Sequence, residues 1–163
     1  MEQEYFNLLT VLDMLIAFHR ELVSVEQEKI NLIIKQNWKE LEQQVEKSRE
    51  ILKNIQSAEK TRLSIVEKIG GKPELTISEL SKSMPEGMRE DILTSTRRLC
   101  SLITELKNLN ERSTLLLSSS LEVVEFTLSL FAGASSNGKT YSGNGEEKRD
   151  EGRHTSLVLD MKA

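Results

Sequence analysis

The chain has 163 residues, of which 37% are hydrophobic and 29% are charged, and its net charge is −4 at pH 7. This length suits one domain of about 100–150 residues, or one domain with a tail. The acidic balance provides no basic patch for nucleic acid. Glycine and proline are too sparse along most of the chain for a β-sandwich or barrel, which needs turns about every 8–12 residues. We therefore expect an all-α fold.

The sequence also indicates a compartment. The N-terminus is acidic, whereas a secretory signal begins with basic residues. The sequence contains no stretch of about 18 consecutive apolar residues, so it predicts no membrane span. A single cysteine, Cys100, cannot form an internal disulfide, which suits a reducing cytosol. We expect a cytoplasmic protein that does not insert into a membrane.

Apolar residues recur every seven positions through residues 2–34, and the first helix is predicted over residues 2–36. Tyr5 and Leu12 form one row, and pairs of leucine, isoleucine and valine run beside it. This spacing predicts an α-helix with a wide apolar stripe. The stripe is interrupted at His19 and Glu26, where we expect the helix to be less covered.

A second helix is predicted over residues 38–69. Asn37 and Glu40 have the spacing of a capping box, and Gly70-Gly71 provides a stop signal. The predicted apolar seam of this helix consists of Trp38, Leu41, Val45, Leu52, Ile55, Val66 and Ile69.

Thr76 and Glu79 form another capping-box pattern, which opens a short helix over residues 77–84. Pro85 suits the first position of a long final helix over residues 85–131, because a missing N–H is tolerated there. Gly, Ser, Asn and mixed charges then predict a flexible tail. The domain boundaries follow as a helical domain over residues 1–131 and a tail over residues 132–163.

The predicted architecture is an elongated antiparallel three-helix bundle or coiled coil, with a short extra helix and a flexible C-terminal tail. At about 1.5 Å per residue the final helix is about 70 Å long, against about 50 Å for each of the first two. In an up–down–up bundle it passes the turn between the first two helices near residue 119. Residues 121–131 then have no partner within the bundle.

This final stretch is apolar as well as long, since only Glu122 and Glu125 are ionised between residues 113 and 131. An apolar helix end is unfavourable in water unless something covers it. A kink that folds it back and a homodimer are two explanations. A third is a surface that binds another protein's helix.

Residues 133–140 (Gly-Ala-Ser-Ser-Asn-Gly-Lys-Thr) match the spacing of a phosphate-binding loop. Such a loop needs a helix after it, so that backbone N–H groups face the phosphates. Residues 141–145 (Tyr-Ser-Gly-Asn-Gly) cannot hold a helix, so we expect no nucleotide site.

Other catalytic signals are absent. His19 and His154 are far apart, and no histidine or cysteine pair has metal-ligand spacing. Cys100 stands next to the apolar stripe of the final helix, which predicts a buried, inert thiol. We expect no catalytic residue, no metal, no cofactor and no enzymatic activity.

Residues 109–116 (Leu-Asn-Glu-Arg-Ser-Thr-Leu-Leu), followed by Ser120-Leu121, resemble the last helix of FlgN-type flagellar export chaperones. Residues 140–143 (Thr-Tyr-Ser-Gly) resemble the segment in which this family places an aromatic residue after its bundle. Residues 26–41 and 59–63 are similar to its first hairpin. The resemblance covers nearly the whole chain, although Ser113 stands where family members tend to repeat an asparagine.

This resemblance implies a specific function. FlgN-type proteins bind the C-terminal helical segments of the flagellar hook-associated proteins that form the hook–filament junction. They prevent premature association of these clients and deliver them to the type III export gate. The family's tail aromatic, which corresponds to Tyr141, is implicated in docking to the cytoplasmic domain of the gate.

The functional hypothesis is therefore a cytoplasmic export chaperone whose final helix binds a client helix. The predicted client-binding residues are Leu116, Leu117, Leu121, Val124, Leu128 and Phe131. Two alternatives remain open at this stage: a dimeric structural coiled-coil or adaptor protein, and a chaperone for the filament cap or the filament protein.

Overall fold

The computed structural model describes residues 2–72, 75–82 and 84–136. The helices in order are α1 (Glu2–Ile34), α2 (Trp38–Gly70), α3 (Ile77–Ser81) and α4 (Glu86–Ser136). No strand occurs among these described residues, which confirms the all-α prediction. The chain divides into two units, Met1–Phe126 and Thr127–Ala163, and α4 begins in the first and ends in the second.

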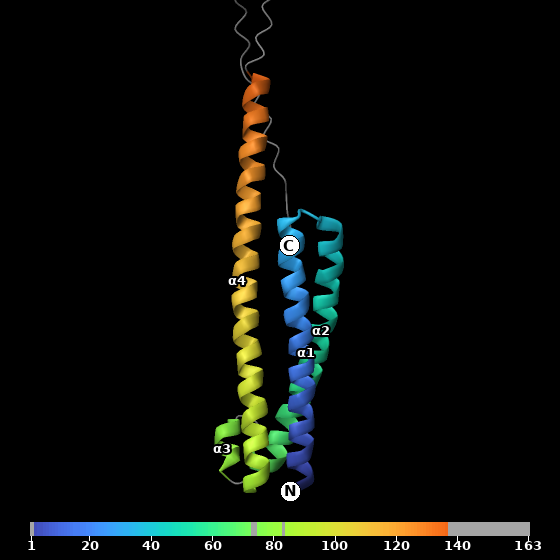
Figure 1. Ribbon diagram of the computed structural model, residues 1–163, viewed down its shortest axis with the longest axis vertical. Helices are drawn as coiled ribbons and strands as arrows, with labels where there is room; N and C mark the ends of the chain where they lie inside the picture. The colour runs from blue at the N-terminus through green and yellow to red at the C-terminus, as the bar shows by residue number, and fades with distance from the viewer. Residues whose placement is uncertain (1, 73–74, 83, 137–163) are drawn as a thin grey trace, which may run out of the picture. The chain divides into compact units, whose positions relative to one another are not determined.

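The first unit is an up–down–up helical bundle. A turn over residues 35–37 reverses the chain, so that α2 returns beside α1, and α4 runs alongside both as far as that turn, near Ser119 and Ser120 (Figure 1). Ser95 donates a hydrogen bond to Asp13 at 3.4 Å, and Gln27 donates one to Glu105 at 3.3 Å. Because both residue numbers increase together along these contacts, α4 is parallel to α1.

Buried apolar residues form two clusters in this unit. The first is centred on Leu8, Leu12, Val66 and Ile92, each at most 1% exposed, and extends to Leu80 of α3. The second cluster consists of Leu22, Val23, Val25, Ile51 and Leu106, with Leu102 and Leu109 packed against it. The apolar contribution of α4 to these clusters therefore ends at Leu109.

Four sequence expectations about burial in α1 and α2 are wrong. Trp38 and Leu52 were predicted in the α2 seam, but they are 49% and 45% exposed. The buried residues of α2 instead lie at Ser48, Ile51, Ala58, Ile65 and Val66. His19 and Glu26 were expected to be poorly covered, but both are buried, because α1 packs against α2 and α4 on different sides.

The helix ends follow the predicted chemistry closely. Gly71 adopts the left-handed region at φ 74°, and its N–H donates to the carbonyl of Glu67 at 2.7 Å. Asn37 accepts from the backbone N–H of Glu40 at 3.4 Å. Thr76 and Glu79 make both bonds of a capping box at the start of α3.

Five helix limits differ from those expected. Helix α1 ends at Ile34 and α2 at Gly70, against the predicted residues 36 and 69. The short helix α3 ends at Ser81, before the predicted residue 84. Helix α4 starts at Glu86, and the carbonyl of Pro85 accepts its first bond, from the N–H of Arg89 at 3.0 Å. The same helix ends at Ser136, after the predicted residue 131, so residues 123–131 are helical despite an alternation that also fits a strand.

Candidate functional site

The part of α4 beyond the second cluster exposes large apolar side chains. Within the first unit these are Leu115, Leu117, Leu121, Val123, Val124 and Phe126, all more than half exposed except Leu117 at 38%. We call these six residues the α4 apolar surface. At about 100° per residue, Leu117, Leu121 and Val124 share one flank of α4, whereas Leu115, Val123 and Phe126 lie on the other. Neighbouring exposed apolar residues mark binding surfaces more often than isolated ones do.

The predicted client-binding residues fall into three groups. Leu117, Leu121 and Val124 belong to the α4 apolar surface, whereas Leu116 is partly buried on the bundle side of the helix. Leu128 and Phe131 belong to the second unit and are also exposed. Tyr141, predicted to dock on the export gate, lies outside the described residues.

The exposure follows from helix geometry. The bundle-facing positions of α4 alternate in steps of four and three residues, and they are Leu102, Leu106, Leu109, Ser113, Leu116 and Ser120. Leu117 and Leu121 each follow one of these positions by a single residue, which rotates them by about 100° around the helix axis. They therefore lie beside the seam instead of in it.

The hydroxyl groups near this surface are already bonded. Thr114, Ser118, Ser119 and Ser120 each donate to the backbone carbonyl four residues earlier, at 2.9–3.0 Å. A donor that is satisfied within its own helix can be covered by an apolar group without losing a hydrogen bond. The serines therefore do not prevent an apolar partner from packing here.

A groove of about 340 Å³ lies where α4 passes the α1–α2 turn. Its walls are Gln36 and Trp38 on one side and Leu116, Ser119, Ser120, Val123 and Val124 of α4 on the other. This agrees with the expectation that the final helix passes the turn near residue 119. Trp38 was not predicted as a site residue. The length argument could have identified it, because Trp38 begins α2 and so lies at the turn that α4 passes.

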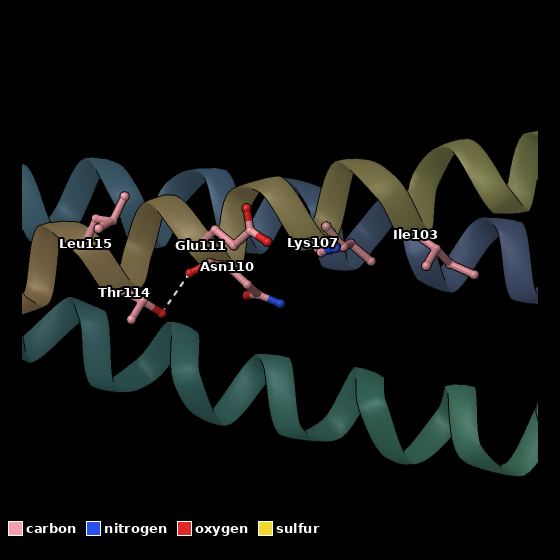
Figure 2. A pocket seen from close by; sticks show the side chains of 7 residues that line it. Ile103, Lys107, Asn110, Glu111, Thr114 and Leu115 are labelled. Carbon is pink, nitrogen blue, oxygen red and sulfur yellow. Dashed lines mark hydrogen bonds between the residues drawn. The ribbon is translucent and has the colours of Figure 1, made fainter.

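A longer groove follows α4 toward its N-terminal end (Figure 2). It measures about 770 Å³ and is lined by Ile103, Leu106, Lys107, Asn110, Glu111, Thr114 and Leu115. Its lining combines apolar and polar side chains, and most of the exposed groove wall is apolar. Leu115 belongs to both the groove and the α4 apolar surface, so apolar exposure continues along α4 from one to the other.

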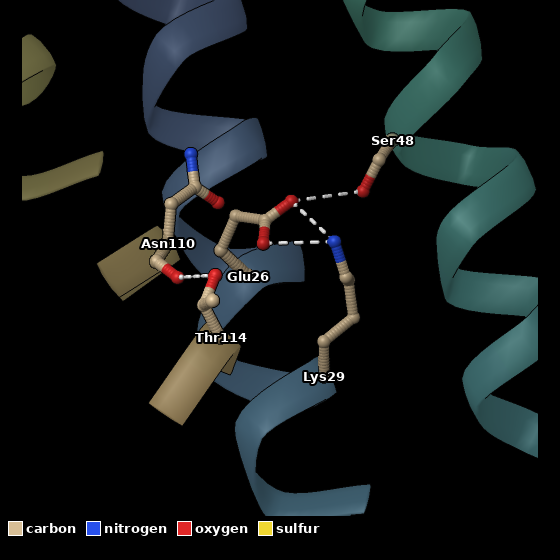
Figure 3. A network of polar contacts seen from close by, with 5 residues as sticks. All are labelled: Glu26, Lys29, Ser48, Asn110 and Thr114. Atoms are coloured by element: carbon tan, nitrogen blue, oxygen red, sulfur yellow. Dashed lines mark hydrogen bonds and ion pairs between the residues drawn. The ribbon is translucent and has the colours of Figure 1, made fainter. Parts of the chain in front are cut away.

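A buried polar network lies at the same level of the bundle (Figure 3). The carboxylate of Glu26 accepts from Ser48 of α2 at 3.1 Å, and Lys29 donates to both of its oxygens at 2.8 Å. On α4, Ser113 is buried, and its hydroxyl has no hydrogen-bond partner among the described residues. The interior is thus polar at this level, and buried apolar side chains return in α1 at Ile30, Leu32 and Ile33.

The described residues offer little for catalysis. They contain no group of three or more histidine, cysteine or acidic side chains that could hold a metal ion. Cys100 is exposed, which corrects the prediction of a buried thiol. Residues 133–136 belong to α4, so half of the phosphate-loop pattern is helical, and residues 137–140 lie outside the described part.

One finding concerns membranes. The Glu86–Phe131 part of α4 is long and apolar enough to cross a bilayer by length and composition alone. A core helix of a soluble protein passes the same test, so a single helix of this kind carries little weight.

The structure is thus a helical bundle whose final helix exposes an apolar surface. A family model described as FlgN protein matches residues 1–149. The chain therefore belongs to the FlgN family and is a flagellar export chaperone in the general sense. No curated protein and no solved structure was found to match it.

Proposed function

We propose that this chaperone binds the C-terminal helical segments of flagellar hook-associated proteins in the bacterial cytoplasm, on the α4 apolar surface. The observation that carries the proposal is the run of exposed Leu117, Leu121 and Val124 on one helix of a FlgN-family bundle. In the proposed complex the client's amphipathic helix covers these residues. Covering them also keeps the client's own apolar face from associating too early.

The energetics suit a reversible complex. Each buried leucine or valine contributes roughly 1.5–3 kcal/mol gross. Loss of rigid-body freedom and ordering of the client segment offset several kcal/mol of that total. The net affinity is then moderate, as release of the client at its destination requires.

The test is the double variant Leu121→Asp with Val124→Asp. Two carboxylates on the α4 apolar surface should lower client affinity at least tenfold, since a buried unpaired charge is strongly unfavourable. Titration calorimetry with the C-terminal segment of a hook–filament junction protein measures the affinity. Helicity by circular dichroism should stay unchanged, because both residues are exposed.

The matched control is Leu52→Asp with Leu63→Asp, two exposed leucines on α2. This variant should bind the client like the original chain. Client binding by the Leu121/Val124 variant at undiminished affinity would show that the site lies elsewhere.

Delivery to the export gate is the second part of the proposal. Tyr141, with the segment that follows α4, would dock on the cytoplasmic domain of the type III export gate. Tyr141→Ala should leave client affinity intact and weaken binding of the chaperone to the gate domain. Equal gate affinity for both chains would remove Tyr141 from this role.

A dimeric coiled-coil or adaptor protein is the alternative, because the same exposed surface can pair with a second copy. Analytical ultracentrifugation over a range of concentrations separates the two. A tight dimer that buries Leu121 would favour the alternative, and a monomer that binds its client one to one would favour the chaperone. A client pull-down followed by mass spectrometry distinguishes junction proteins from filament and cap proteins.

A further inference from the structure

We propose that Trp38 is part of the client-binding site, so that the bound helix contacts the α1–α2 turn as well as α4. This inference rests on the proposed function and adds a residue from a different element to the same site. It places one bulky apolar side chain of the client in the groove between Trp38 and α4.

The groove is continuous with the α4 apolar surface. Val123 and Val124 line the groove and also belong to that surface, and the partly buried Leu116 forms its bundle side. A helix that covers Val124 therefore also reaches the groove, because Val124 lines it. The client helix that covers the α4 apolar surface is also the segment nearest to the groove. We therefore assign the groove to a side chain of that helix.

The chemistry of the groove favours an apolar side chain. Ser119 and Ser120 donate to the carbonyls of Leu115 and Leu116, so their hydroxyl protons need no further acceptor. Because these serine side chains are small, they leave space between the larger side chains that line the groove, such as Trp38 and Val124. The Trp38 ring provides a wide apolar wall, and tryptophan is among the residues that contribute most when an interface buries them.

Packing within the bundle does not require the Trp38 side chain. It is 49% exposed at the first position of α2, and it belongs to neither of the two apolar clusters. A half-exposed tryptophan in an open groove is a large apolar group whose burial remains available to a partner.

The chain contains one tryptophan, so its fluorescence reports on this residue alone. The probe is a synthetic peptide with the C-terminal sequence of a hook–filament junction protein from the same bacterium, with any tryptophan replaced by phenylalanine. The full chain is titrated with the peptide while emission and acrylamide quenching are recorded. Calorimetry measures binding in parallel.

We expect the emission maximum to shift to shorter wavelength and quenching to fall as the peptide binds. Trp38→Ala should weaken binding at least about tenfold, as a central aromatic contact does. The matched control is Phe6→Ala, another exposed aromatic, near the start of α1. That variant should bind the peptide normally.

The outcomes separate the two proposals. Binding by calorimetry without any change in Trp38 emission or quenching would overturn this inference and leave the proposed function standing. Failure of the peptide to bind at all would overturn the proposed function itself. A shift in emission that appears on concentrating the chain alone would assign the groove to a second copy and overturn the client contact.

Discussion

Ser48 on α2 donates its hydroxyl hydrogen bond to Glu26 on α1 at 3.1 Å, inside a bundle where the two residues are 5% and 4% exposed. Lys29 neutralises the same carboxylate from 2.8 Å. A buried carboxylate is tolerated when it is both paired and hydrogen-bonded. This polar contact therefore joins α1 and α2 beyond the apolar clusters, next to the site where α4 becomes exposed.

Removal of this contact should destabilise the bundle. Ser48→Ala leaves one oxygen of Glu26 with a single partner, and a hydrogen bond to a charged group contributes about 1.5–3 kcal/mol. We expect the free energy of unfolding in urea to fall by about that amount, with an unchanged m value.

Ser57→Ala is the control for Ser48→Ala, because Ser57 is an exposed serine on the same helix. Both changes bring the same gain in helix propensity, so the difference between them isolates the buried bond. Equal stability of the two variants would show that the Ser48–Glu26 bond contributes nothing.

The cap of α3 should respond to pH. Hydrogen bonds from the backbone and side chain of Thr76 hold the pKa of Glu79 below its ordinary value of 4.5. A lowered pKa in the folded state means that the stabilising contribution is complete above pH 4.5 and is lost as pH falls through the folded pKa. The amide signal of Thr76 in NMR spectra should therefore move in that acidic range. Glu79→Gln should abolish this pH dependence, and a signal that still titrates would assign it to another group.

Two glycines should respond in opposite directions to the same substitution. Gly71 has φ 74°, a region in which a Cβ is disfavoured by about 1–2 kcal/mol, so Gly71→Ala should destabilise by that amount. Gly87, in the first turn of α4, has no atom within 4 Å of an added Cβ. Gly87→Ala should stabilise by about 0.4–1 kcal/mol, because it restricts the unfolded chain. Thermal melts measure both, and a stabilised Gly71→Ala variant would contradict the role of the left-handed turn.

Periodicity and end signals predicted most of the helical architecture. The seven-residue repeat of α1, the stop at Gly70-Gly71 and the capping box at Thr76 each depend on neighbours in sequence, which a single chain displays directly. The level at which α4 passes the α1–α2 turn, near residue 119, followed from the rise per residue alone. Exposure of Leu121 and Val124 then followed from the unequal helix lengths.

Burial on a particular side of a helix was harder to predict. Cys100 follows Leu99 by one residue, and that rotation of about 100° is enough to expose it. Glu26 is charged, so it was assigned to a poorly covered position, but its partners Ser48 and Lys29 satisfy it inside the bundle. Trp38 was assigned to the seam because it is apolar, whereas its place at the start of α2 puts it at the turn. Such contacts depend on residues distant in sequence.

Ser113 should be replaceable without loss, in contrast to Ser48. Its hydroxyl is buried without a hydrogen-bond partner among the described residues, so the folded state carries the desolvation of that group uncompensated. Ser113→Ala should therefore leave the free energy of unfolding unchanged or raise it by about 1 kcal/mol. Ser118→Ala is the control, since Ser118 is exposed and bonded to Thr114. A loss of more than 1 kcal/mol for Ser113→Ala alone in urea denaturation would mean that the hydroxyl has a partner in solution, such as a buried water.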